Sequence, residues 1–201
     1  MQSDLFADAN TIAVTQTKEW GEILTGTERR NRFSLDFDGM AGALLAVEQG
    51  SGWPLFFLGS MRSYTLAVQT REGKPVLRMH SPFRIVGRQV SVMASDGKLL
   101  GTVRRRLSLV RTRYDVFDAR PAPLFEITRG FVKRWTFTTS RNGAEVAVIV
   151  KRWTRPVLAQ LKNEARFELQ FPAVHAPAER ALLLAALFLI DFQHFEESGG
   201  E

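Results

Sequence analysis

The sequence predicts a mainly-β protein, a closed antiparallel β-barrel that encloses a hydrophobic α-helix near the C-terminus. Hairpin signals and alternating apolar runs recur at even spacing through the middle of the chain, and no long helical pattern interrupts them. Many short antiparallel strands are typical of a sandwich or a barrel. The segment 181–190 is apolar at every position, so as a helix it has no polar face and must be buried on all sides. A barrel with a helix through its middle satisfies both observations.

Three turns are predicted from their residues. Asp96-Gly97 and Asn142-Gly143 each lie between two strand-like runs, and such pairs tolerate the positive φ of tight hairpin turns. Glu72-Gly73 marks a third hairpin. The glycines between residues 39 and 52 have the composition of a loop, without the Lys-Ser/Thr that would follow in a phosphate-binding loop.

Alternating runs supply the remaining strands. They are predicted at 109–117, 124–128 and 166–171, and together with the hairpins they give nine or ten strands. The last run is strict, with Phe167 and Leu169 on one face and Arg166 and Glu168 on the other.

The C-terminal helix is predicted over 177–195, beginning at a proline suited to the first helical position. Its unbroken apolar run of ten residues spans about 15 Å, whereas a bilayer core is about 30 Å thick. Charged residues flank the run at Glu179, Arg180 and Asp191, which favours a buried core helix over a spanning one. The predicted core positions are Leu182, Leu183, Leu184, Leu187, Phe188, Leu189 and Ile190.

Composition limits the possible functions. The 27 Lys and Arg against 21 Asp and Glu give a net charge of +6, which favours an anionic partner, either lipid headgroups or nucleic acid. The absence of cysteine excludes disulfides and thiolate chemistry and fits a reducing compartment. The N-terminus lacks the apolar core of a secretory signal. The three histidines are isolated in sequence, so we expect no catalytic residues and a protein that is not an enzyme.

Basic residues are the candidate lipid-binding residues. Three arginines run together, two more alternate on a following strand, and the tetrapeptide KRWT occurs twice, pairing cations with Trp135 and Trp153. The candidates are Arg104, Arg105, Arg106, Arg111, Arg113, Lys133, Arg134, Lys151 and Arg152. The alternative is that these are solvated barrel faces with both tryptophans turned inward. Cations that share a face would each be attracted to anionic lipid by about 1 kcal/mol.

No linker or composition break divides the chain, so a single domain is predicted over 21–197. Residues 1–20 are predicted to be a poorly defined tail, either a disordered segment or an extra edge strand, and residues 198–201 a C-terminal tail.

Several segments, in order, resemble the phospholipid scramblases, a family whose fold is related to the tubby C-terminal domain. The segments include EILTGTERRNRFSL, SYTLAVQTREGKPVLRMHSPFR and GTVRRRLSLVRTRYDVFDA, and the most specific part is QFP followed by FLID and FE. The resemblance covers about residues 20–197. It implies a twelve-stranded, tubby-like barrel around the C-terminal helix. It also implies a membrane-associated protein at the cytoplasmic face that binds phospholipid and promotes its movement between leaflets. The alternative is a soluble tubby-like module that binds phosphoinositide, a protein or nucleic acid.

The sequence departs from that family in two respects. The family often carries cysteines that accept fatty acyl chains, and this chain has none. The positions that match the family's proposed calcium-binding aspartates hold Asn163, Ala165 and Val174. Because calcium prefers six to eight oxygen ligands with several carboxylates, Glu164 and Glu168 alone do not form that site, and no cofactor is expected.

Overall fold

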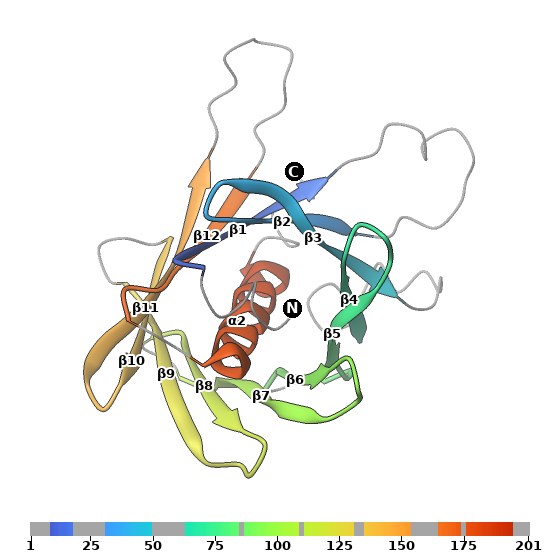
Figure 1. The fold of residues 1–201 in the computed structure, drawn as a ribbon. Coiled ribbons are helices and arrows are strands. Elements are labelled where there is room, and N and C mark those ends of the chain that lie inside the picture. Colours follow the sequence, from blue (N-terminus) through green and yellow to red (C-terminus); the bar gives the residue numbers. More distant parts are fainter. Residues whose placement is uncertain are drawn as a thin grey trace, which may run out of the picture.

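The structure is a computed structural model that describes residues 9–17, 31–49, 63–84, 87–108, 111–130, 135–153, 165–173 and 176–194. Over these ranges, twelve antiparallel strands close into one barrel around the helix α2 (Pro177–His194), as Figure 1 shows. The predicted fold class is therefore confirmed. The strands are β1 (Thr11–Thr17), β2 (Arg32–Phe37), β3 (Met40–Gln49), β4 (Tyr64–Gln69), β5 (Pro75–Ser81), β6 (Gln89–Ala94), β7 (Leu99–Arg106), β8 (Arg113–Asp118), β9 (Pro123–Arg129), β10 (Thr136–Arg141), β11 (Ala144–Trp153) and β12 (Ala165–Gln170).

Strand β1 closes the barrel, because it pairs with β12 on one side and β2 on the other. Ile12 and Val14 point into the core and are at most 3% exposed. The predicted domain boundary at residue 21 is therefore wrong: the domain includes β1, which is neither a tail nor an edge strand. Closure also satisfies the backbone groups of β1 on both sides, which an edge strand leaves open.

The predicted hairpins form, but their turns differ in conformation. Asn142 and Gly143 both have positive φ, 51° and 82°, as a two-residue hairpin turn requires. At Asp96-Gly97 only the glycine is left-handed, with a φ of 84°, and its N–H donates to the Ala94 carbonyl. Glycine is therefore required at one position of that turn rather than two.

The sequence also contained a hairpin that the interpretation missed. Asp38 and Gly39 have φ values of 45° and 85° and connect β2 to β3. The loop interpretation of the glycines from residue 39 is wrong here, because β3 begins at Met40 and Gly42 lies within it. The Asp38 carboxylate stabilises the turn by accepting the N–H groups of Asn10 and Thr11 at 2.7–3.0 Å.

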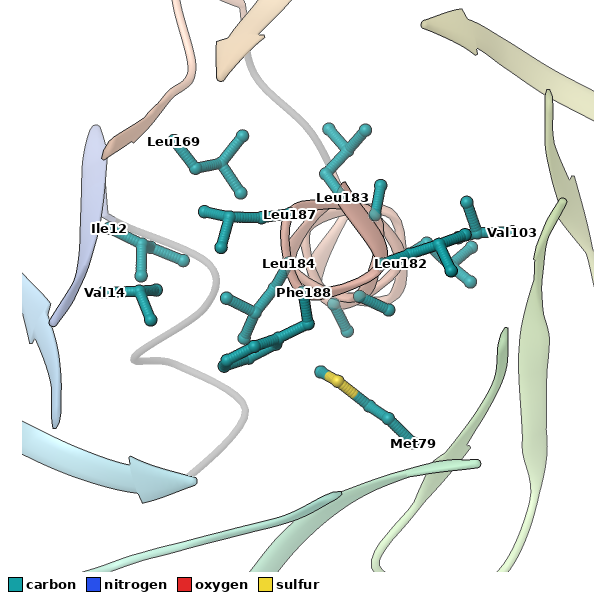
Figure 2. Packing of buried hydrophobic residues seen from close by; sticks show 14 of the residues in the cluster. Ile12, Val14, Met79, Val103, Leu169, Leu182, Leu183, Leu184, Leu187 and Phe188 are labelled. Carbon is teal, nitrogen blue, oxygen red and sulfur yellow. The ribbon is translucent and has the colours of Figure 1, made fainter. Parts of the chain in front are cut away.

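The helix α2 fills the barrel. Every residue from Ala181 to Ile190, including all seven predicted core positions, is at most 2% exposed. Figure 2 shows side chains leaving the helix in several directions, with Leu182 towards Val103 and Leu187 towards Leu169. The helix is therefore the centre of the hydrophobic core. Within the described ranges, no helix is long and apolar enough to cross a membrane.

Polar contacts fix the start of α2 at one end of the barrel, which we call the N-terminal mouth. The Arg180 guanidinium donates to the Ala9 carbonyl and lies 4.6 Å from the centre of the Phe171 ring. Glu179 accepts a hydrogen bond from Arg141 at 2.5 Å.

The other end, where α2 terminates, is the C-terminal mouth. The Tyr114 hydroxyl donates to Gln193 Oε1 at 3.0 Å, and the Phe192 ring centre lies 4.5 Å from that of Tyr64. Because the strands form an uninterrupted meander, the connections after β5, β7, β9 and β11 all leave from this mouth.

Candidate functional site

Cations that are far apart in the sequence meet at the C-terminal mouth. The Arg105 N–H donates to the Arg88 carbonyl at 2.8 Å, and Arg105 pairs with Tyr114 in the barrel wall. Arg129 adjoins the start of β8, and the Lys151 N–H donates to the Trp135 carbonyl at 2.9 Å. We use the name basic mouth for a set of seven described cations at this end of the barrel. They are Arg84, Arg88, Arg104, Arg105, Arg111, Arg129 and Lys151.

Four of these cations continue the inward-facing side of their strands. Arg88, Arg105, Arg129 and Lys151 each lie two residues from a fully buried side chain, namely Val90, Val103, Ile127 and Ile149. Alternation along a strand therefore directs them towards the end of the core. They lie at the end of the barrel where α2 terminates, and there the helix dipole is negative and stabilises cations.

Lys151 and Arg88 are the two buried members of the four, each with only 6% of its surface exposed. The Lys151 Nζ lies 5.3 Å from the centre of the Phe167 ring and 5.7 Å from that of Trp135, within the range of cation–π attraction. Burial lowers the pKa of Lys151 from its usual 10.5 to about 8, and the carboxylate of Asp191 on α2 acts in the opposite direction. The structure therefore places the side chain of this predicted lipid-binding residue largely inside the end of the barrel.

Tyr114 ties the barrel wall to the end of the helix. Burial raises the pKa of its phenol, while the charges of Arg105, Arg129 and Arg88 act to lower it. The hydroxyl is therefore a neutral donor, and Gln193 Oε1 accepts its proton. Within the described residues, Gln193 Nε2 is buried without a hydrogen-bond partner.

Three predicted candidates are neutralised by carboxylates on the outer wall. Arg106 contacts both oxygens of Asp115, at 2.6 and 2.9 Å, and Glu126 at 3.4 Å. Arg113 lies 3.8 Å from Glu126. In the same way, the Arg152 guanidinium lies 2.5 Å from Glu168. Their charge is already compensated, so they are weaker ligands for an external anion.

The predicted candidates that are exposed at the basic mouth are Arg104, Arg105 and Arg111. Lys133 and Arg134 fall outside the described residues. Sequence reasoning missed Arg84, Arg88 and Arg129, although Arg129 directly follows the predicted strand 124–128 and lies two residues from Ile127.

Trp135 lies among these cations. It has the strand parity of buried Phe137 but precedes β10, and 39% of it is exposed. Its ring centre is 5.7 Å from the Arg129 guanidinium carbon. The alternative interpretation placed Trp135 inside the core. Trp135 does lie on the inward side of its strand, but part of its ring is exposed at the C-terminal mouth.

The calcium prediction concerns positions that are mostly outside the described ranges, which exclude Asn163 and Val174. Ala165 is the first residue of β12 and has no side-chain oxygen. Among the residues that the structure describes, no group of three His, Cys, Asp or Glu side chains could hold a metal ion. The expected lack of a calcium site stays a prediction.

Comparison with known proteins gives a consistent similarity. A model of the scramblase family matches residues 2–197. Mouse phospholipid scramblase 4 is 22% identical over 209 residues, which cover 96% of this chain and 64% of that protein. Mouse phospholipid scramblase 1 is 22% identical, with 98% and 65% covered. Human phospholipid scramblase family member 5 is 22% identical, with 93% and 74% covered. The chain thus spans slightly less than two thirds of the two mouse relatives, and no solved structure gives a significant match.

Proposed function

Because the chain belongs to the scramblase family, we propose that it is a peripheral phospholipid-binding protein whose basic mouth engages anionic headgroups at the cytoplasmic face of a membrane. The observation that carries this proposal is the gathering of cations around one end of the barrel, beside exposed aromatic and aliphatic side chains. Cations gathered at one end of the barrel suit a flat anionic surface. A groove lined with arginines and aromatic residues would favour nucleic acid instead.

The proposed interaction is one of binding and needs no catalytic group. Each exposed cation near an anionic membrane contributes about 1 kcal/mol, and the effect decays within a Debye length. Arg104, Arg105 and Arg111 would together contribute about 3 kcal/mol at low ionic strength, which is roughly a hundredfold in affinity. We therefore expect reversible binding that weakens as salt is added.

Co-sedimentation with vesicles tests the proposal. The protein is expected to bind vesicles that contain phosphatidylserine and to bind pure phosphatidylcholine vesicles much less. The triple variant Arg104→Gln, Arg105→Gln, Arg111→Gln should lose most of this binding. The matched control is Lys74→Gln, Lys98→Gln, Arg120→Gln, because those exposed cations lie in turns at the N-terminal mouth and their loss changes the net charge equally. Equal losses in the two triple variants would show that only net charge matters and would refute a basic-mouth site.

Movement of lipid between leaflets is the further activity proposed from the relatives' names. In this chain the apolar helix is enclosed by the barrel, so exchange would require the helix to leave it or lipid to pass along the protein surface. A leaflet-exchange assay on protein-bearing vesicles tests this separately from binding. Exchange no faster than in protein-free vesicles would restrict the function to lipid binding.

We also propose that binding does not depend on calcium, because Ala165 replaces a carboxylate of the family's acidic segment. Binding should be the same in excess calcium and in excess chelator, and an increase with calcium would contradict this. Absence of binding to any vesicle would favour the alternative of a module for a protein or nucleic acid.

A further inference from the structure

Five large apolar side chains are exposed within the described ranges, and their positions are not random. Met40, Phe83, Leu99, Leu107 and Trp135 are 39–69% exposed. Met40 and Leu99 lie beside hairpin turns at the N-terminal mouth. The other three lie at the C-terminal mouth, where they alternate with the cations of the basic mouth.

Each of the three can be placed from its neighbours. Phe83 follows β5, whose last residue Ser81 pairs with Tyr64, and Tyr64 packs on the end of α2. Leu107 directly follows Arg106, which pairs with Arg113 at the start of β8.

Trp135 precedes β10 and lies under the guanidinium of Arg129. Thus Phe83, Leu107 and Trp135 come from three successive connections on one side of the barrel.

Apolar tips interleaved with cations are suited to the interface of an anionic bilayer. Aromatic rings are stable at headgroup level, and Phe and Leu gain energy by entering the boundary with the acyl chains, while nearby cations attract anionic lipid. A purely aqueous role would leave these apolar surfaces exposed among charges. The charge and the apolar tips therefore indicate the same partner.

We propose that the C-terminal mouth docks end-on against an anionic phospholipid bilayer, with Phe83, Leu107 and Trp135 entering the interface. This inference rests on the proposed function. It adds which end of the barrel contacts the membrane, which side chains insert into it and how the barrel is oriented. In this arrangement the carboxyl end of α2 faces the bilayer and the N-terminal mouth faces the solvent. The inserted side chains give binding a component that salt does not remove.

The cysteine-free sequence allows a direct test by single labels. Phe83→Cys and Leu107→Cys, each carrying an environment-sensitive fluorophore, should show blue-shifted, enhanced emission on vesicles that contain phosphatidylserine. A quencher attached to the lipid acyl chains should reduce that emission. Met40→Cys and Leu99→Cys are the matched controls at the opposite mouth and should not respond. Responses at positions 40 and 99 that equal or exceed those at 83 and 107 would overturn the orientation.

A second pair of variants tests how much an exposed apolar side chain at each mouth contributes to the affinity for vesicles. Leu107 and Met40 are similarly exposed, at 69% and 63%. Leu107→Glu should weaken vesicle binding by about tenfold or more, because it removes an apolar contact and adds a like charge, whereas Met40→Glu should change it less than about twofold.

The outcomes separate the two proposals. Binding to anionic vesicles with no response at positions 83 and 107 would overturn the docking geometry and leave lipid binding standing. No binding by the unlabelled protein would overturn both. A response that depends on protein concentration without vesicles would identify a second copy of the chain as the partner, and would also overturn the docking geometry.

Discussion

Replacing Lys151 by methionine should stabilise the protein at neutral pH. Lys151 is buried inside the C-terminal mouth, and burial lowers its pKa from 10.5 to about 8. A shift of one pKa unit corresponds to about 1.4 kcal/mol, so keeping this amine charged costs the folded state up to about 3 kcal/mol. Methionine has a similar length and makes favourable contacts with aromatic rings such as Phe167.

The pH dependence follows from the sign of that shift. The folded pKa of Lys151 is lower than the unfolded one, so between pH 8 and 10.5 the unfolded chain holds a proton that the folded protein has lost. The free energy of unfolding contributed by this residue therefore rises with pH across that window. Below pH 8 the folded protein bears the full free-energy cost of a charged Lys151 amine, and above pH 10.5 this cost is absent.

Lost attractions reduce the expected gain. The attraction to Asp191 is already included in the lowered pKa, so the remaining loss in Lys151→Met is that of the two cation–π contacts, each worth on the order of 1 kcal/mol. We therefore expect a net stabilisation of about 1 kcal/mol at pH 7, which shrinks towards zero or below as the pH passes 10.5.

Urea denaturation of the wild type and of Lys151→Met at pH 7 and pH 10.5 measures this difference, because other titrating groups cancel between the two proteins. Lys151→Arg is the control: its charge cannot titrate in this range, so it should show no gain at either pH. A Lys151→Met variant that is less stable at pH 7, or a difference that does not narrow with pH, would refute the reasoning.

Three further predictions concern the core, and all are measured by urea denaturation. Phe188→Ala should lower the free energy of unfolding by about 3–5 kcal/mol, because Phe188 is 1% exposed and its ring centre lies 5.1 Å from that of Phe33. A decrease below about 1 kcal/mol would contradict the place of α2 at the centre of the core. Gly101→Ala should cost at least about 2 kcal/mol, since φ is +155° and a Cβ there would lie 2.1 Å from the Phe117 carbonyl oxygen. Thr139→Val should be neutral or stabilising by about 1 kcal/mol, because within the described residues the buried hydroxyl has no hydrogen-bond partner; a clear loss would indicate that it has one.

The barrel and its helix could be predicted because their signals are local. A run that is apolar at every position from Ala181 to Ile190 requires burial on all sides, and Asn142-Gly143 requires a tight turn wherever it lies. The hairpin at Asp38-Gly39 carried the same kind of signal and was missed because neighbouring glycines resembled a loop.

Strand β1 could not be assigned in this way. Its segment, TIAVTQT, is short and largely polar, and its role depends on pairing with β12, more than 140 residues away in the sequence. Only closure of the barrel gives Ile12 and Val14 a core to enter. Long-range pairing of this kind leaves no local signature.

The candidate site was predictable in composition but not in geometry. Arg105 and Arg106 are neighbours in sequence, and strand alternation directs one to the inner mouth and the other to Asp115 on the outer wall. The two residues of a basic run therefore have different roles, and the pairing of β7 with β8 brings Asp115 close to the outward-facing one. A count of cations along the sequence does not identify the carboxylate that a neighbouring strand brings to one of them.

The meander explains why the basic segments meet at all. In an antiparallel meander, alternate connections lie at the same end, so segments that recur every two strands are neighbours in space. Arg84 follows β5, Arg111 follows β7, and Trp135 follows β9 with its cation Arg129 at the strand end. The same two-strand period places Phe83, Leu107 and Trp135 at this mouth, and Met40 and Leu99 at the other. A shared function would explain why the cations and the apolar side chains follow the same period. The labelled cysteines at positions 107 and 40 test this, because they measure which of the two mouths contacts the membrane.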